Sequence, residues 1–187
     1  AVNSFYLEPN GNILWFGTET GLVRKDLTTN LLREFVHDPK NPNSLNNNTV
    51  VAIKADENGK LYIGTHTGGL DLFDPATGNF THIKPANSTA GNTMDSLHSI
   101  FIEYDTYLWL GGEQGLARVD RSTNNFIVWR FNKEDAKGIS GATVFSMAKD
   151  KKNNIWIANV GGLDRFISDS NSFRHYLKDY IVRAVLV

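Results

Sequence analysis

The sequence has no cysteine among its 187 residues. That absence excludes disulfide bonds, thiolate zinc sites and a cysteine nucleophile. Positive charge is not in excess either, since 19 Lys and Arg stand against 20 Asp and Glu. A chain without a cationic surplus lacks the usual means of holding nucleic acid by counterion release, so we expect no direct nucleic-acid binding. No apolar run approaches the roughly 18 residues of a membrane-spanning helix.

What the sequence does contain is a repeat of 47 residues. Trp15, Tyr62, Trp109 and Trp156 are each separated by that interval, and a Gly-Leu pair follows each aromatic residue. A period between about 20 and 50 residues is typical of proteins whose units bury their apolar faces only by stacking on neighbours. We therefore interpret the aromatic residues as core between repeats rather than as exposed platforms for sugars.

The second repeat shows the strand pattern best. Apolar residues alternate with period two, and turn residues such as Asn-Gly separate the segments. The pattern predicts four strands, at Thr49–Ala55, Leu61–Thr65, Leu70–Phe73 and Asn79–Lys84. Four short antiparallel strands in a repeat of this length make one blade of a β-propeller. The fold class is therefore predicted to be all-β, with about four consecutive four-stranded blades.

The predicted blade boundaries are approximately 1–48, 49–98, 99–142 and 143–179. Residues 180–187 are predicted to be the first strand of a following blade. Because a closed ring needs no such surplus strand, we expect a fragment of a larger propeller of seven or eight blades. A four-bladed ring closed by strand exchange is the alternative.

The repeat has a recognisable sequence motif. Asp56 to Leu70 reads Asp-x-x-Gly-x-Leu-Tyr-Ile-Gly-Thr-x-x-Gly-Gly-Leu, and similar segments recur at 11–22, 108–120 and 154–163. It resembles the regulator propeller repeats of the periplasmic sensor domains of bacterial hybrid two-component proteins. The resemblance implies a carbohydrate-binding sensor in the periplasm, with an oligosaccharide ligand. It also implies that the parent receptor supplies further blades, a β-sandwich, the membrane anchor and a histidine kinase. Association of two copies is left open.

Two sets of loops are expected to share one face of the propeller. The first set follows the second strand of each blade and carries a polar residue four positions after the aromatic in three repeats. The second set connects successive blades and is rich in amides, at 38–48, 85–98 and 132–142. Amides, carboxylates and hydroxyls suit sugar hydroxyls, whereas Asn, Pro, Gly and Ser are also the residues that loops use for turn geometry. The predicted ligand-binding residues are Glu19, His66, Glu113, Gln114, Asn159 and Asn47.

The same residues leave two alternative functions open, an enzyme and a protein-binding scaffold. Glu19 and Glu113 could be the acid and base of a propeller lyase or glycan hydrolase, whose carboxyl groups must lie roughly 5 to 10 Å apart. A scaffold that binds only protein is the third reading. The five histidines lack metal-ligand spacing, and no phosphate-binding loop opens a helix. We therefore predict no catalytic residues, no metal and no cofactor for this chain.

Overall fold

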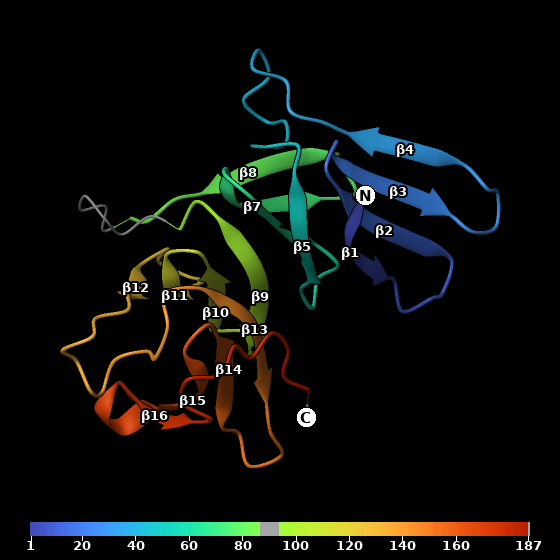
Figure 1. Ribbon diagram of the computed structural model, residues 1–187. Coiled ribbons are helices and arrows are strands. Elements are labelled where there is room, and N and C mark those ends of the chain that lie inside the picture. Colours follow the sequence, from blue (N-terminus) through green and yellow to red (C-terminus); the bar gives the residue numbers. More distant parts are fainter. Residues whose placement is uncertain (87–93, 187) are drawn as a thin grey trace. The chain divides into compact units, whose positions relative to one another are not determined.

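The computed structural model describes residues 1–86 and 94–186 (Figure 1). Within these ranges the protein consists of four four-stranded antiparallel sheets, and its one helical segment is the short 3-10 turn η1 (Ser168–Ser170). The predicted propeller blades are thus confirmed, and we call the sheets blades 1 to 4 in chain order. They form two compact units, the first comprising 1–84 with 95–97 and the second 85–94 with 98–187.

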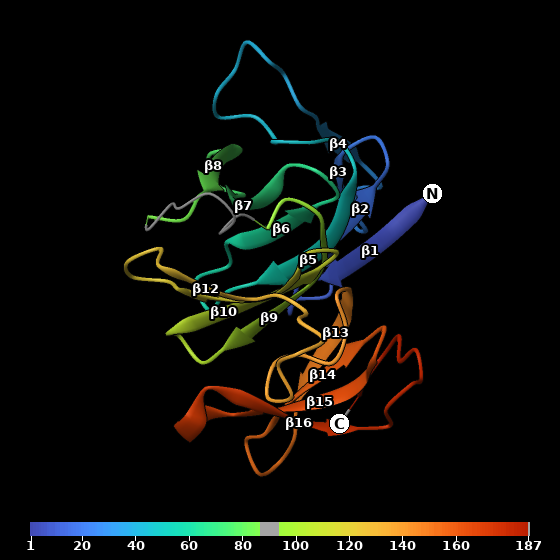
Figure 2. The same ribbon diagram turned by 60° about the vertical axis from the view of Figure 1, so that its left-hand side comes forward.

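The first unit contains blades 1 and 2. Blade 1 consists of β1 (Val2–Leu7), β2 (Ile13–Thr18), β3 (Leu22–Asp26) and β4 (Leu32–Phe35). Blade 2 consists of β5 (Val50–Ala55), β6 (Leu61–Thr65), β7 (Gly69–Asp74) and β8 (Asn79–Ile83). In both sheets the spatial order follows the chain order, and β1 runs beside β5 (Figure 2).

The second unit contains blades 3 and 4. Blade 3 consists of β9 (Leu97–Glu103), β10 (Tyr107–Gly112), β11 (Gly115–Asp120) and β12 (Phe126–Trp129). Blade 4 consists of β13 (Val144–Lys149), β14 (Ile155–Asn159), β15 (Gly162–Ile167) and β16 (Ser172–Tyr176). Here β10 packs beside β13, as β2 packs beside β5 in the first unit.

Aromatic side chains from neighbouring blades form the core of each unit. Trp15 of blade 1 is 1% exposed and meets Phe73 of blade 2 edge-on, with ring centroids 5.4 Å apart. Trp109 of blade 3 is fully buried and meets Phe166 of blade 4 in the same way, at 4.8 Å. The prediction that the repeated aromatics form inter-blade core is confirmed at these two positions, whereas Trp156 is only half-buried.

The glycine that follows the Trp-x pair in blades 1 and 3 marks a close approach between blades. A Cβ added at Gly17 would lie 2.7 Å from Cγ1 of Val50, and one at Gly111 would lie 2.6 Å from Cγ1 of Val144. Both distances are too short for a carbon contact, so a missing side chain lets the first strand of the next blade approach. Blade 4 carries Ala158 there, and it is fully buried.

The strands lie close to the predicted blade limits, with two differences. Strand β9 begins at Leu97, two residues before the predicted limit of 99. Residues 181–186 form no strand in the structure, and Val187 lies outside the described residues, so a first strand of a following blade at 180–187 stays a prediction. A first strand is held by the second strand of its own blade. These residues instead donate singly, from Val182 N to Asn159 O and from Val185 N to Ser146 Oγ.

Aspartates at the hairpin turns give the fold a dependence on acid. Hydrogen bonds from residues within the turns and strands lower the pKa of four of them, namely Asp26, Asp74, Asp120 and Asp150. For Asp150 the largest cause is the hydrogen bond from the indole of Trp156, at 2.9 Å. A lowered pKa in the folded state stabilises the protein above the unfolded-state pKa, and this contribution is lost as pH falls through the folded value.

We therefore expect stability to fall as the pH drops below about 4, and to fall less in Asp150→Asn than in the parent protein. Urea unfolding at pH 7 and at pH 2.5 measures the difference. An equal decline in both proteins would contradict the role of Asp150. The buried Asp71 works in the opposite direction, because desolvation raises its pKa.

Candidate functional site

The structure places the predicted site residues of the first unit on one loop face. The turn between β6 and β7 contains the exposed His66, whose backbone N–H donates to Thr49 O at 2.9 Å. Asn47 lies in the connection beside this turn, and its side-chain oxygen accepts from Thr49 N at 2.9 Å. Glu19 is exposed in the corresponding turn of blade 1, with the amino group of Ala1 3.7 Å away. The turn and the connection therefore share a face in blade 2, as expected.

In the second unit the predicted residues differ strongly in exposure. Glu113 is exposed and Gln114 is half-buried in the turn between β10 and β11. Asn159 is fully buried at the end of β14. Its amide donates to Asp164 at 2.9 Å, and its oxygen accepts from Gly161 N at 2.8 Å. The side chain of Asn159 thus fixes the turn from within instead of facing solvent.

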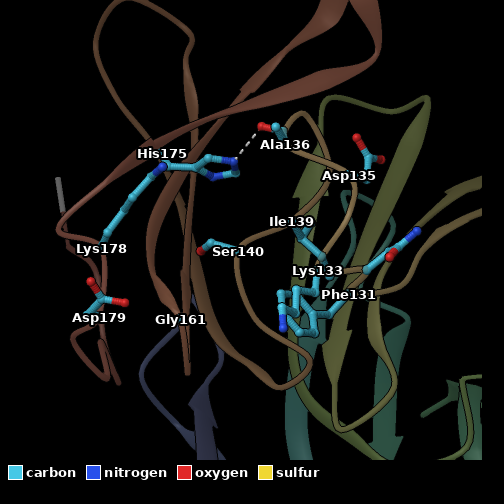
Figure 3. A pocket seen from close by; sticks show the side chains of 11 residues that line it. Phe131, Lys133, Asp135, Ala136, Ile139, Ser140, Gly161, His175, Lys178 and Asp179 are labelled. Carbon is cyan, nitrogen blue, oxygen red and sulfur yellow. Dashed lines mark hydrogen bonds between the residues drawn. The ribbon is translucent and has the colours of Figure 1, made fainter.

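A cavity of about 360 Å³ opens on the loop face of the second unit (Figure 3). It lies where the connection from blade 3 to blade 4 meets the turn after β14 and the end of β16. Its lining residues are Phe131, Asn132, Lys133, Asp135, Ala136, Ile139, Ser140, Gly161, His175, Lys178 and Asp179. Figure 3 shows His175 and Lys178 on one side and Phe131 and Lys133 on the other. None of the six predicted residues lines this cavity.

One wall of the cavity is anchored by a buried carboxylate. Asp164 of β15 accepts hydrogen bonds from Ser140 N at 2.8 Å and from His175 Nδ1 at 2.8 Å. The other ring nitrogen of His175 meets the carbonyl oxygen of Ala136 at 3.0 Å. The two ring nitrogens of His175 therefore connect β15 with the connection between blades 3 and 4. Together with the bond from Phe173 N to Lys137 O, these contacts hold the connection onto blade 4.

The first unit contains the same set of contacts, which we call the Asp–His fastening. In it, a buried aspartate accepts from a backbone N–H of the connection and pairs with a histidine of the fourth strand. Asp71 of β7 is buried, and it accepts from Asn46 N at 2.8 Å and pairs with His82 Nδ1 at 2.7 Å. The spacing of Asp and His is 11 residues in both blades. Blades 1 and 3 have Val23 and Ala117 at the position of the aspartate. The sequence contains this signal, but it becomes visible only when the third and fourth strands are paired in register.

Charged and aromatic side chains line the cavity together, whereas the turns that the sequence analysis singled out form no such group. Two lysines, Lys133 and Lys178, face it together with the carboxylates of Asp135 and Asp179. Phe131, 46% exposed at the rim, supplies an apolar ring. Across the described part of the chain, no group of three or more His, Asp or Glu side chains is arranged to hold a metal ion. The same residues include no helix long and apolar enough to span a membrane.

Comparison with known proteins identifies the repeat. The family model described as two-component regulator propeller matches residues 44–67 and 138–161, which contain the first and second strands of blades 2 and 4. The chain is also similar to the solved extracellular domain of BT3049 from B. thetaiotaomicron, described as part of a hybrid two-component system, with 25% identity and a TM-score of 0.79. That match covers 92% of this chain and 23% of the other.

Two further solved structures share the fold. PorZ of the type-IX secretion system of Porphyromonas gingivalis has 14% identity and a TM-score of 0.73, over 100% of this chain and 30% of PorZ. The WD40 repeats of RRP9 have 10% identity and a TM-score of 0.67, over 95% of this chain and 51% of RRP9. Among curated proteins the sequence has no match. The chain thus spans a quarter to a half of the solved structures it resembles, and two of its segments match the two-component regulator propeller model.

Proposed function

We propose that this chain is part of the ligand-sensing module of a two-component receptor, and that the cavity in its second unit binds an oligosaccharide. The likeness to the BT3049 extracellular domain supports the sensing role and a location outside the inner membrane, in the periplasm. The remaining blades, a β-sandwich and a histidine kinase belong to the parent protein in this proposal. Binding would bias the receptor through different affinities for its two signalling states, for which about 1 to 3 kcal/mol suffices.

The side chains that line the cavity are the reason for proposing an oligosaccharide as the ligand. Sugars present hydroxyl groups that accept and donate hydrogen bonds, together with apolar ring faces that pack on aromatic side chains. Lys133 and Lys178 supply donors, Asp135 and Asp179 supply acceptors, and Phe131 supplies a ring at the rim. The wall behind them is fixed by Asp164 and its partners, so the backbone of the connection is already held in place when a ligand binds.

The proposal is tested by screening the protein against an array of defined oligosaccharides and titrating the hits calorimetrically. We expect Phe131→Ala and Lys178→Ala each to weaken binding about tenfold or more, because each removes a side chain from the cavity rim. Lys40→Ala is the matched control, since Lys40 is an exposed lysine of the connection in the first unit. Its affinity should equal that of the parent protein.

Two results would count against the proposal. Unchanged affinity in both cavity variants would place the ligand elsewhere, with the turns of Glu19, His66, Asn47, Glu113 and Gln114 as the next surfaces to test. Recovery of cleaved sugar would favour an enzyme, and Glu19→Gln and Glu113→Gln would then be expected to abolish turnover. A sensor returns its ligand intact.

A further inference from the structure

A second cavity, of about 480 Å³, lies between blades 1 and 2 in the first unit. Its walls come from the hairpin turns after the first and third strands, at 8–12, 56–60 and 75–78, and from the strand ends beside them. Because successive strands run in opposite directions, these turns lie at the other end of the blade from the loops that carry His66 and Asn47. The cavity therefore lies off the loop face, and its volume falls within the range of small-molecule sites.

The wall from blade 1 combines a phenol with a carboxylate. Tyr6 of β1 is half-buried, and Glu8 accepts the indole N–H of Trp15 at Oε1, at a distance of 2.8 Å. That bond leaves Oε2 of Glu8 for a ligand. Desolvation and, to a smaller extent, the charge of Glu8 raise the pKa of Tyr6, so the phenol stays neutral at neutral pH. Tyr6 and Glu8 both line the cavity.

The wall from blade 2 carries two charges that balance each other. Lys60 Nζ lies 3.3 Å from Oδ2 of Asp74, and both residues line the cavity. Among the described residues of the lining, Glu8 is the remaining charged one, so the surplus charge is negative. A cleft with surplus negative charge attracts cations. The lining thus favours a cationic ligand.

The second unit shows which group fills the corresponding space between its own two blades. Glu103, the counterpart of Glu8, accepts the indole N–H of its blade at 2.7 Å. The next residue, Tyr104, has the ammonium nitrogen of Lys149 3.7 Å from its ring centre. The hydroxyl of Tyr104 donates to Asn153 at 2.9 Å. A lysine ammonium on an aromatic ring is attracted by the charge distribution of that ring.

The first unit lacks these three side chains at the equivalent positions. Ala55 and Lys149 each end the first strand of the second blade in their unit. Gly59 and Asn153 are the same turn residue two periods apart, and both have positive φ, at 78° and 64°. Pro9 takes the position of the tyrosine. The cavity, which Pro9 and Gly59 line, therefore lies where the second unit places a lysine on an aromatic ring.

We propose that this cavity binds an alkylammonium group, supplied by a lysine side chain of a partner protein or by a free amine. The ammonium donates to Oε2 of Glu8 and lies against the ring of Tyr6, while the alkyl chain packs on Pro9. A charge-assisted hydrogen bond and a cation–π contact act together in this arrangement. The site lies in the first unit and is independent of the proposed sugar site, so either proposal can fail without the other.

The test is a titration of the full chain with n-butylammonium chloride at constant chloride concentration, followed by the indole N–H signals in ¹H–¹⁵N spectra. Trp15 reports on Glu8 through its hydrogen bond, and its signal is assigned through Trp15→Phe. The indole of Trp109 is the internal control, because Lys149 already fills the corresponding space. We expect a saturable shift at Trp15 and none at Trp109. Butan-1-ol, which has the same alkyl length and no charge, should shift neither signal.

Two variants locate the ammonium. Glu8→Gln keeps an oxygen for the indole N–H and removes the charge, so we expect binding to weaken about tenfold. Glu34→Gln, at an exposed carboxylate of β4, is the matched control and should bind as the parent protein does. The triple variant Ala55→Lys, Pro9→Tyr and Gly59→Asn copies the arrangement of the second unit. Its own lysine should fill the cavity and abolish the response of Trp15, whose signal also reports that the variant is folded.

The outcomes separate the proposal from its failure. An unmoved Trp15 signal, an equal response at Trp109 or to butan-1-ol, or unchanged affinity in Glu8→Gln overturns it. A folded triple variant that still binds butylammonium does the same. Nα-acetyl-lysine amide distinguishes the two sources of the ammonium. Binding about tenfold tighter than butylammonium would assign the site to a lysine of a partner protein, and equal affinity would assign it to a free amine.

Discussion

Replacement of Trp109 by Ala is expected to lower the free energy of unfolding by about 3 to 5 kcal/mol. Trp109 is fully buried and stacks on Trp129, with centroids 5.6 Å apart and an interplanar angle of 11°. It also meets Phe166 of blade 4, so its removal empties a space that two blades share. The indole N–H donates to Glu103 at 2.7 Å, and that carboxylate would lose its partner. Urea unfolding followed by circular dichroism measures the loss.

Trp156→Ala is the matched comparison for Trp109→Ala. Both residues occupy the same repeat position, and both donate the indole N–H to a carboxylate at the end of the blade's first strand. Because Trp156 is half-buried, its truncation should cost distinctly less, about 1 to 2 kcal/mol. Equal losses in the two variants would contradict the view that the covering blade supplies most of the stabilisation at Trp109.

Asp164→Ala is expected to destabilise the second unit by about 3 to 5 kcal/mol. The fully buried carboxylate accepts from Ser140 N, Asn159 Nδ2 and His175 Nδ1. Its removal leaves these donors without an acceptor, and unmade hydrogen bonds of buried groups are costly. The connection that lines the cavity should loosen as well, which faster hydrogen exchange at residues 133–140 would report. Asp169→Ala, at an exposed position of η1, is the control and should change stability little.

The sequence of blade 3 suggests a second substitution that would reduce the loss of stability caused by Asp164→Ala. It has Ala117 at the position of Asp164, and Val128 stands opposite at the position of His175. The double variant Asp164→Ala with His175→Val therefore copies an apolar pair that the fold already uses. A buried ion pair replaced as a whole costs less than one that is broken. We expect the double variant to be more stable than Asp164→Ala alone, and a less stable double variant would contradict this account.

The fold was predictable because its determinants lie in short segments that recur. The interval between Trp15 and Trp109 and the glycines at 17 and 111 specify stacked blades without any knowledge of distant contacts. The degree of burial was less predictable, since it depends on the neighbour that covers a face. Trp156 has the same local sequence as Trp109 and yet is half-buried, because no described blade packs on it.

The candidate site was much harder to predict. Sequence position pointed to the turns after the second strands, where Glu19 and Glu113 are exposed, but these turns lie in separate units. The cavity residues depend on cross-strand pairing: His175 reaches the connection only because β16 pairs with β15 and brings it to Asp164. Asn159 has the amide side chain that was expected at the site. Because it is buried, this amide forms its hydrogen bonds within the protein. Residues 87–93 of the predicted loop 85–98 lie outside the described residues.

The Asp–His fastening has a consequence for how such a chain can lengthen or shorten. It occurs in blades 2 and 4, whereas the paired positions hold Val23 and Glu34 in blade 1 and Ala117 and Val128 in blade 3, so neighbouring blades are not equivalent. The family model matches the same alternate blades. Within the described chain the fastening thus recurs in every second blade. Duplication or loss of a pair preserves the alternation, whereas loss of a single blade brings two blades of the same kind together.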